Sequence, residues 1–132
     1  IILGMALGFL LMAVGYSILI FLGEIKFVSF NYDFKSIMLL FILFIAVSLV
    51  EETYVRGYVL KNLLKSFNPV VSLIISSAIF SLLHFFNPNV NYIALTELFI
   101  AGILLGVSYV YTKNLWFPIA LHLSWNFLFF NI

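Results

Sequence analysis

The chain consists of long apolar stretches that are separated by short polar breaks. A helix that crosses a bilayer needs about 20 mostly apolar residues, and the stretches have this length or approach it. They cover residues 1–22, 36–50 with a continuation to about 64, 70–86, 92–112 and 115–131. Pro69 suits the first turn of the third helix. The pattern therefore predicts an all-α, polytopic transmembrane helical bundle of about five spans.

The polar breaks predict the connections between these helices. Residues 23–35 carry Glu24, Lys26 and Asp33 and are expected to form an aqueous loop, and shorter breaks follow at 65–69, 87–91 and 113–114. No stretch has the pattern of a soluble domain or of a repeat, so we expect residues 1–132 to form a single integral membrane domain. Because the sequence begins inside an apolar run without Met, we expect it to be an N-terminally truncated piece with further helices before Ile1.

Composition excludes several classes of protein. Hydrophobic residues make up 65% of the chain and charged residues 8%, whereas a soluble domain has about 25% charged residues. The lipid bilayer is therefore the first expected partner. The chain has no Cys, which excludes a disulfide scaffold and a thiol nucleophile. A net charge of +1 offers no basic face for nucleic acid, and Asp33 as the only aspartate excludes a pair of catalytic aspartates.

Ionisable side chains inside a span cost roughly 2.5–3.5 kcal/mol each on insertion scales, so the few in this chain are candidates for function. Glu52 and Arg56 have the i, i+4 spacing of a helical ion pair. Glu51 points about 100° away around the helix, so we expect it to lie outside this ion pair. Burial without a cation raises the pKa of a carboxyl group, which would suit Glu51 to proton transfer. The alternative is that all three lie in the interface at the helix end, near Lys61 and Lys65.

Two histidines complete the set of candidates. His84 lies near the end of the third predicted helix, one turn after Phe80, where an interfacial position is as plausible as a catalytic one. His122 and Asn126 share one face of the last helix. Two such donors can hold an oxyanion, but a polar pair in a membrane also commonly joins neighbouring helices.

The fourth predicted helix carries two further features. Gly102 and Gly106 are four residues apart, a spacing typical of close helix packing in membranes. Glu97, earlier on the same helix, is either interfacial or a partner for Arg56.

A general base, an imidazole and a pair of donors form a consistent set for the attack of water on a carbonyl. Glu51 would take the proton, His84 would orient or share it, and His122 with Asn126 would hold the oxyanion. The zinc-protease motif His-Glu-x-x-His is absent. We therefore expect no cofactor and no metal, although two histidines and a glutamate leave zinc open. Haem held by two histidines is also open, but it would leave Glu51, Glu52 and Asn126 without a role.

Four motifs follow one another, each on a separate predicted helix. They are Glu-Glu-x-x-x-Arg (Glu51, Glu52, Arg56), Phe-x-x-x-His (Phe80, His84), Phe-x-x-Gly-x-x-x-Gly (Phe99, Gly102, Gly106) and His-x-x-x-Asn (His122, Asn126). In this order, over a core of about residues 50–127, they resemble the CPBP family of intramembrane glutamic endopeptidases. That family includes the CAAX prenyl endopeptidases and bacterial proteins linked to bacteriocin processing and self-immunity.

The resemblance implies a membrane endopeptidase of the CAAX prenyl protease type, with its polar catalytic cluster inside the bundle. In this family the glutamate and the histidine of the first two motifs activate water, and the last motif supplies the oxyanion hole. The site residues so implied are Glu51, His84, His122 and Asn126, with Glu52 and Arg56 in support.

The resemblance leaves the substrate open between a prenylated protein and a leader or bacteriocin peptide. A second hypothesis is a non-catalytic membrane immunity or binding module of the same fold, because some bacterial relatives have immunity roles. The sequence is rich in Ile, Phe and Asn and poor in Ala. That composition suits AT-rich bacterial coding, so we expect the protein in a bacterial plasma membrane.

Overall fold

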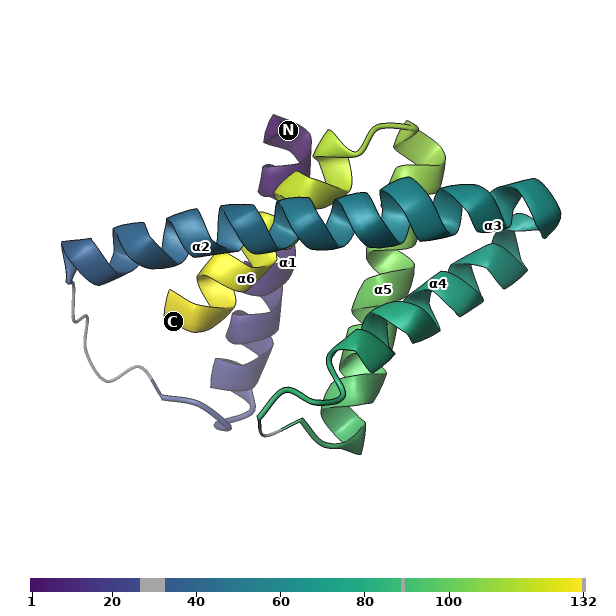
Figure 1. The fold of residues 1–132 in the computed structure, drawn as a ribbon. Coiled ribbons are helices and arrows are strands. Elements are labelled where there is room, and N and C mark those ends of the chain that lie inside the picture. Colours follow the sequence, from purple (N-terminus) through teal and green to yellow (C-terminus); the bar gives the residue numbers. More distant parts are fainter. Residues whose placement is uncertain (27–32, 89, 132) are drawn as a thin grey trace. The chain divides into compact units, whose positions relative to one another are not determined.

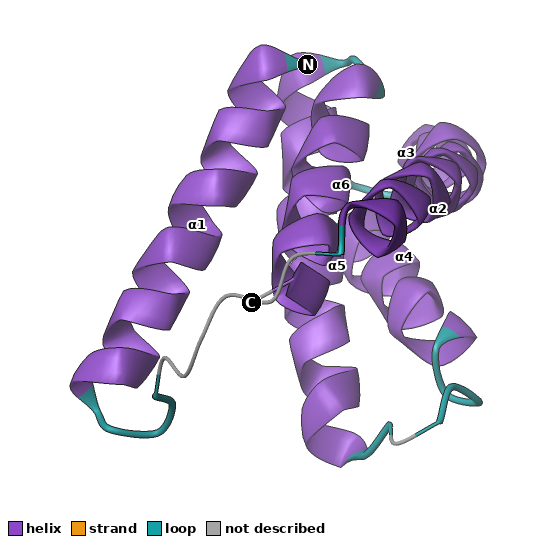
Figure 2. Cartoon of the chain, turned by 90° about the vertical axis from the view of Figure 1, so that its left-hand side faces the viewer, coloured by secondary structure: helices purple, strands orange, loops and turns teal. Residues whose placement is uncertain are grey.

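The computed structural model describes residues 1–26, 33–88 and 90–131. These residues form helices and their connections and contain no strand (Figures 1 and 2). The elements are α1 (Ile2–Phe21), α2 (Phe34–Glu52), the π-helix η1 (Thr53–Leu60), α3 (Lys61–Ser66), α4 (Pro69–Leu83), α5 (Tyr92–Thr112) and α6 (Trp116–Asn131). The predicted all-α class is confirmed. Of the predicted loop 23–35, residues 27–32 lie outside the described part.

Membrane-spanning length is reached by three helical segments of the described chain. These are α1, the continuous run Phe34–Ser66 and α5, which are long and apolar enough to cross a bilayer. Helix α4 is apolar but has 15 residues. The chain is therefore an integral membrane protein built from helices, and each of the five predicted helical stretches has its counterpart in the structure.

The chain forms two compact units, which are described separately. The first unit contains Ile1–Leu49 and Ile119–Ile132, and the second contains Val50–Pro118.

In the first unit, glycines allow α1 to pack closely against α6. Gly4, Gly8 and Met12 form the buried face of α1. A Cβ atom at Gly8 would lie 3.0 Å from the carbonyl oxygen of Leu121 and would overlap the hydroxyl of Ser124. This contact was not predicted, although the spacing of Gly4 and Gly8 is the same small-residue pattern as that of Gly102 and Gly106.

In the second unit, local sequence sets the ends of α4. The side chain of Asn68 accepts a hydrogen bond from the backbone N–H of Val71 at 3.0 Å, and Pro69 occupies the first turn, as predicted. The helix ends at Leu83, so the predicted limit at residue 86 was too long. His84 is the C-cap. Residues 84–86, which the prediction included in the helix, form turns instead.

Helix α5 has the bounds that the hydropathy pattern predicts, Tyr92–Thr112. The side chain of Asn91 accepts a hydrogen bond from the backbone N–H of Ala94 at 2.9 Å and thereby caps the start of the helix. At the other end, Lys113 takes a left-handed conformation with φ 53°, which ends the helix.

Helices α4 and α5 pack through small residues. The buried face of α4 is rich in serine, and its members are Ser72, Ser76, Ser77, Phe80 and Ser81. Opposite them, a Cβ atom at Gly102 would lie 2.9 Å from Cβ of Ser77, closer than real contacts allow. The hydroxyl of Ser81 also donates to the carbonyl of Leu95 at 2.7 Å. The predicted role of Gly102 in close packing is confirmed. A Cβ atom at Gly106 would lie 2.7 Å from Cδ2 of Leu73, which is the end of a flexible side chain.

The π-helix is the main local difference from expectation. The sequence predicts one α-helix through residues 51–64, but Thr53–Leu60 form wider turns with i to i+5 hydrogen bonds. Segments of this kind occur frequently at functional sites. Here the π-helix begins directly after Glu52 and contains Arg56, so it lies within the predicted polar cluster.

Candidate active site

The predicted ion pair between Glu52 and Arg56 is present and completely buried. Nη1 of Arg56 donates to Oε1 of Glu52 at 2.7 Å, and neither side chain is exposed. Nη2 of the same guanidinium donates to the carbonyl oxygen of Gly102 at 3.1 Å. Arg56 is therefore held at two points, one on its own helix and one on α5.

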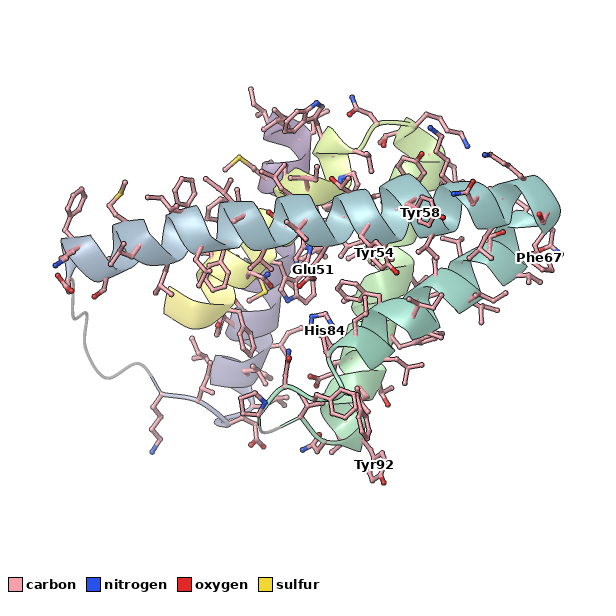
Figure 3. The ribbon with its side chains drawn as sticks, viewed as in Figure 1. Glu51, Tyr54, Tyr58, Phe67, His84 and Tyr92 are labelled. Carbon is pink, nitrogen blue, oxygen red and sulfur yellow. The ribbon has the colours of Figure 1, made fainter. Side chains whose placement is uncertain are left out.

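Glu51 faces a different environment from its neighbour. Its Oε2 atom lies 3.7 Å from Nε2 of His84, and the two side chains retain 27% and 18% of their accessible surface. Figure 3 shows Glu51 at the end of α2 and His84 after α4 directed toward each other. The structure thus brings together two of the predicted site residues that are far apart in the sequence, and each side chain is partly exposed although the Oε2 atom of Glu51 is itself buried.

The backbone determines which nitrogen of His84 carries a proton. Nδ1 lies 2.8 Å from the carbonyl oxygen of Phe80. A carbonyl oxygen only accepts hydrogen bonds, so Nδ1 is the donor, and this bond selects the tautomer. The neutral imidazole then has its lone pair on Nε2, the nitrogen that faces Glu51.

Phe80 lies between the two polar pairs. Its side chain is buried, with 2% exposed. Cζ of Arg56 lies 4.5 Å from the centre of the Phe80 ring, a cation–π distance. The ring centres of Phe80 and His84 are 4.9 Å apart, with 57° between the planes. Sequence reasoning placed Phe80 one turn before His84, but it did not predict either ring contact.

Gly102 also has a role that the sequence did not reveal. Its carbonyl accepts from Arg56, and its missing side chain admits Ser77. Only the packing role could be read from the glycine spacing, because a backbone acceptor leaves no signal in a sequence. Glu97, the other proposed partner of Arg56, is exposed on α5, and the ion pair that the structure gives Arg56 is with Glu52.

His122 and Asn126 belong to α6 in the first unit. His122 is buried, with 6% exposed, and Asn126 is partly buried. The i, i+4 spacing places them on one face of this helix, as predicted. Their association with Glu51 and His84 in one site stays a prediction.

The pair of Glu51 and His84 has the chemistry for activating water. A carboxylate accepts a proton, and a neutral imidazole with a lone pair on Nε2 accepts a hydrogen bond from the same water. As potential metal ligands they are two, whereas a catalytic zinc ion takes three protein ligands. Within residues 1–26, 33–88 and 90–131, no group of three His, Cys, Asp or Glu residues could hold a metal ion.

The membrane-spanning helices and the matching protein family define the chain as a membrane peptidase. The family whose model matches is described as type II CAAX prenyl endopeptidase Rce1-like, and the match covers residues 33–128. The chain belongs to this family, which confirms the resemblance seen in its motifs. The match begins before the expected core at residue 50 and includes every candidate site residue. No curated protein and no solved structure matched the chain.

Proposed function

We propose that the chain is a glutamate-type intramembrane endopeptidase in which Glu51 and His84 activate the hydrolytic water. The observation that carries this proposal is the contrast between the two neighbouring glutamates. Glu52 is sealed against Arg56 in a buried ion pair, whereas Glu51 is partly accessible and lies 3.7 Å from Nε2 of His84. A general base needs a path for water and a partner that orients the water. The partial exposure of the Glu51 side chain and the nearby imidazole of His84 support this role.

In the proposed reaction, a water molecule lies between the Glu51 carboxylate and Nε2 of His84. Glu51 accepts one proton while the water oxygen attacks the peptide carbonyl carbon, which forms a tetrahedral oxyanion. The proton then passes from Glu51 to the leaving nitrogen, and the carbon–nitrogen bond breaks. The products are a carboxylic acid, which keeps the second proton of the water until it ionises, and an amine. The imidazole of His84 holds the water in line by accepting its second hydrogen bond.

His122 and Asn126 are the proposed oxyanion donors. This assignment is supported by their shared face on α6 and by the family resemblance of the His-x-x-x-Asn motif. Donors aimed at a developing oxyanion usually account for a large part of catalysis, and loss of one costs about 10²- to 10³-fold in kcat.

Glu52 and Arg56 are proposed to support the site rather than to react. Their buried bonds fix the turn of η1 that follows Glu51 and connect it to α5 through Gly102. Fixed geometry matters because a displacement of about 1 Å at a reacting group can cost around 10²-fold in rate.

The proposed substrate is a peptide held at the membrane, and the proposed location is a bacterial plasma membrane. The family description favours a prenylated C-terminal peptide. The richness in Ile, Phe and Asn, which suits AT-rich bacterial coding, favours a membrane-bound leader or bacteriocin peptide. A substrate panel decides between the two classes.

The test is a cleavage assay in liposomes with both classes of peptide. We expect wild type to cleave one class, and Glu51→Gln and His84→Ala to lose at least about 100-fold in kcat, the scale of general base catalysis. Glu97→Gln is the matched control, because it changes an exposed carboxylate of the second unit in the same way. Cleavage by Glu51→Gln at the wild-type rate would contradict the proposal. A folded wild type that cleaves no peptide of either class would favour the non-catalytic immunity module instead.

A further inference from the structure

We propose that Phe80 is a positioning residue that holds the imidazole of His84 toward Glu51, and that Arg56 acts on His84 through the Phe80 ring. The inference deepens the proposed function, since it concerns how the water-activating pair is kept in place. It rests on three contacts of Phe80: the ring with Arg56, the ring with the imidazole of His84, and the backbone carbonyl with Nδ1 of His84.

The first observation is that Phe80 contacts both His84 and Arg56. Cζ of Arg56 lies 4.5 Å from the Phe80 ring centre, and the imidazole centre lies 4.9 Å from it. Arg56 is anchored by Glu52 and by the carbonyl of Gly102, so one neighbour of the ring is fixed. A fixed cation attracted to the ring face restricts the tilt of that ring, and the ring in turn restricts the imidazole.

The second observation is that His84 needs such a restraint. It is the C-cap of α4, and the residues that follow it are in turns rather than in a helix. Two bonds rotate between its backbone and its imidazole. The hydrogen bond from Nδ1 to the Phe80 carbonyl removes part of this freedom, and the Phe80 ring removes more by packing against the imidazole. Together they leave Nε2 directed at Glu51.

A leucine at position 80 separates positioning from simple core filling. Leucine is apolar and fills much of the same volume, and such swaps are tolerated best in cores. It has no aromatic face for the Arg56 cation, and it offers no flat surface to the imidazole. Phe80→Leu should therefore fold while it releases His84. Leu60→Ala is the matched control, because it truncates another fully buried side chain of the second unit.

The experiment is nitrogen-15 NMR of the full chain in detergent micelles with labelled histidine. The chain has two histidines, so a His122→Gln sample assigns the signals. We expect wild-type His84 to carry its proton on Nδ1, as expected also for Leu60→Ala. The carbonyl of residue 80 remains in Phe80→Leu, so we expect Nδ1 to keep its proton while the imidazole becomes more mobile, which shifts and broadens the Nε2 signal. We expect roughly a 10- to 100-fold loss of kcat with KM nearly unchanged. His84 signals in Phe80→Leu with the wild-type shift and line width would overturn the proposal.

A second comparison tests the path from Arg56. Arg56→Lys keeps the charge but loses the planar group, and we expect it to shift the His84 signals in the wild-type background. In the Phe80→Leu background the same change should have little further effect. Equal shifts in both backgrounds would show that Arg56 does not act through the ring. The NMR readout does not depend on cleavage, so a failure of the proposed protease activity would be seen separately in Glu51→Gln.

Discussion

Glu51 and Glu52 are adjacent in the sequence and face opposite environments. Glu52 is completely buried and accepts a hydrogen bond from Arg56 at 2.7 Å, whereas Glu51 keeps 27% of its side-chain surface and lies 3.7 Å from Nε2 of His84. The step from one residue to the next around a helix, about 100°, is sufficient to separate them. Two identical side chains can therefore have two roles. We expect substitution of Glu52 to reduce stability and substitution of Glu51 to reduce activity.

Loss of the Glu52 charge should destabilise the protein. Glu52→Gln leaves Arg56 buried without its counter-ion, and breaking a buried pair from one side costs about 3–5 kcal/mol. Thermal or detergent-induced unfolding of the purified protein measures this loss. Glu51→Gln should keep near wild-type stability, because Glu51 is partly exposed. Equal stability of Glu52→Gln and wild type would show that the pair is not structural.

A methyl group at Gly102 should separate α4 from α5. Its Cβ would lie 2.9 Å from Cβ and 3.0 Å from Cα of Ser77, so the two backbones must move apart. Overpacking of this kind costs about 1–3 kcal/mol, and the shift would also weaken the bond from Arg56 to the Gly102 carbonyl. We expect Gly102→Ala to lower both the unfolding temperature and the cleavage rate.

Gly15→Ala provides the control for that substitution. It makes the same change within α1, where no atom of the described residues lies within 4 Å of the added Cβ, apart from the adjacent residues and the backbone of the helix itself. The change should therefore be neutral or slightly stabilising. Adding Ser77→Gly to Gly102→Ala should restore part of the lost stability. If the two alanine variants unfold alike, close packing at Gly102 is not what stabilises the second unit.

Asp33 should make the start of α2 sensitive to acid. The Ser36 hydroxyl donates to the Asp33 carboxylate, and the Ser36 backbone N–H donates to it at 3.2 Å. These bonds lower the pKa of Asp33 from its usual value of 3.8. A lowered pKa means that the folded state favours the charged form, so this stabilisation is present above pH 3.8 and is lost as the pH falls through the lower folded value.

Circular dichroism between pH 6 and pH 2 measures this effect. We expect wild type to lose helicity or thermal stability toward the acid end, more than Asp33→Asn does, because Asn caps a helix without titrating. Identical pH curves for the two proteins would mean that the cap charge does not contribute.

Removal of metal ions should leave cleavage intact. The proposed mechanism activates water with Glu51 and His84 alone, and among the described residues of the second unit no third His, Cys, Asp or Glu joins them. Wild-type cleavage is compared before and after dialysis against a chelator, and then after zinc is returned. Activity that disappears with the chelator and returns with zinc would contradict this expectation.

Hydropathy and spacing were sufficient for the helices and for contacts within one helix. The pattern predicted the bounds of α5, the first turn of α4 at Pro69 and the pair of Glu52 with Arg56. These features depend on residues that are close in the sequence, where the helical period fixes which side chains meet. The packing at Gly102 was also predictable, because small residues four apart mark close helix contacts.

Other features depend on tertiary contacts or on small differences in backbone geometry. The approach of His84 to Glu51 requires the fold of the second unit, and the carbonyl of Gly102 that binds Arg56 has no residue-specific signal. The π-helix was missed because the apolar pattern of Thr53–Leu60 does not distinguish i to i+5 from i to i+4 hydrogen bonds. The position of Phe80 one turn before His84 was predicted, but its ring contact with Arg56 depends on the tertiary fold and was not.

The serine-rich face of α4 has a consequence for how the protein enters its membrane. The helix has 15 residues, which correspond to a length of about 22 Å, less than the hydrocarbon thickness of about 30 Å. Its hydroxyl groups at Ser72, Ser77 and Ser81 are hidden in the fold rather than exposed to lipid. A helix this short, with one polar face, gains little free energy from inserting into the bilayer alone. We therefore expect the translocation machinery to release α4 and α5 into the bilayer together, as a preformed hairpin.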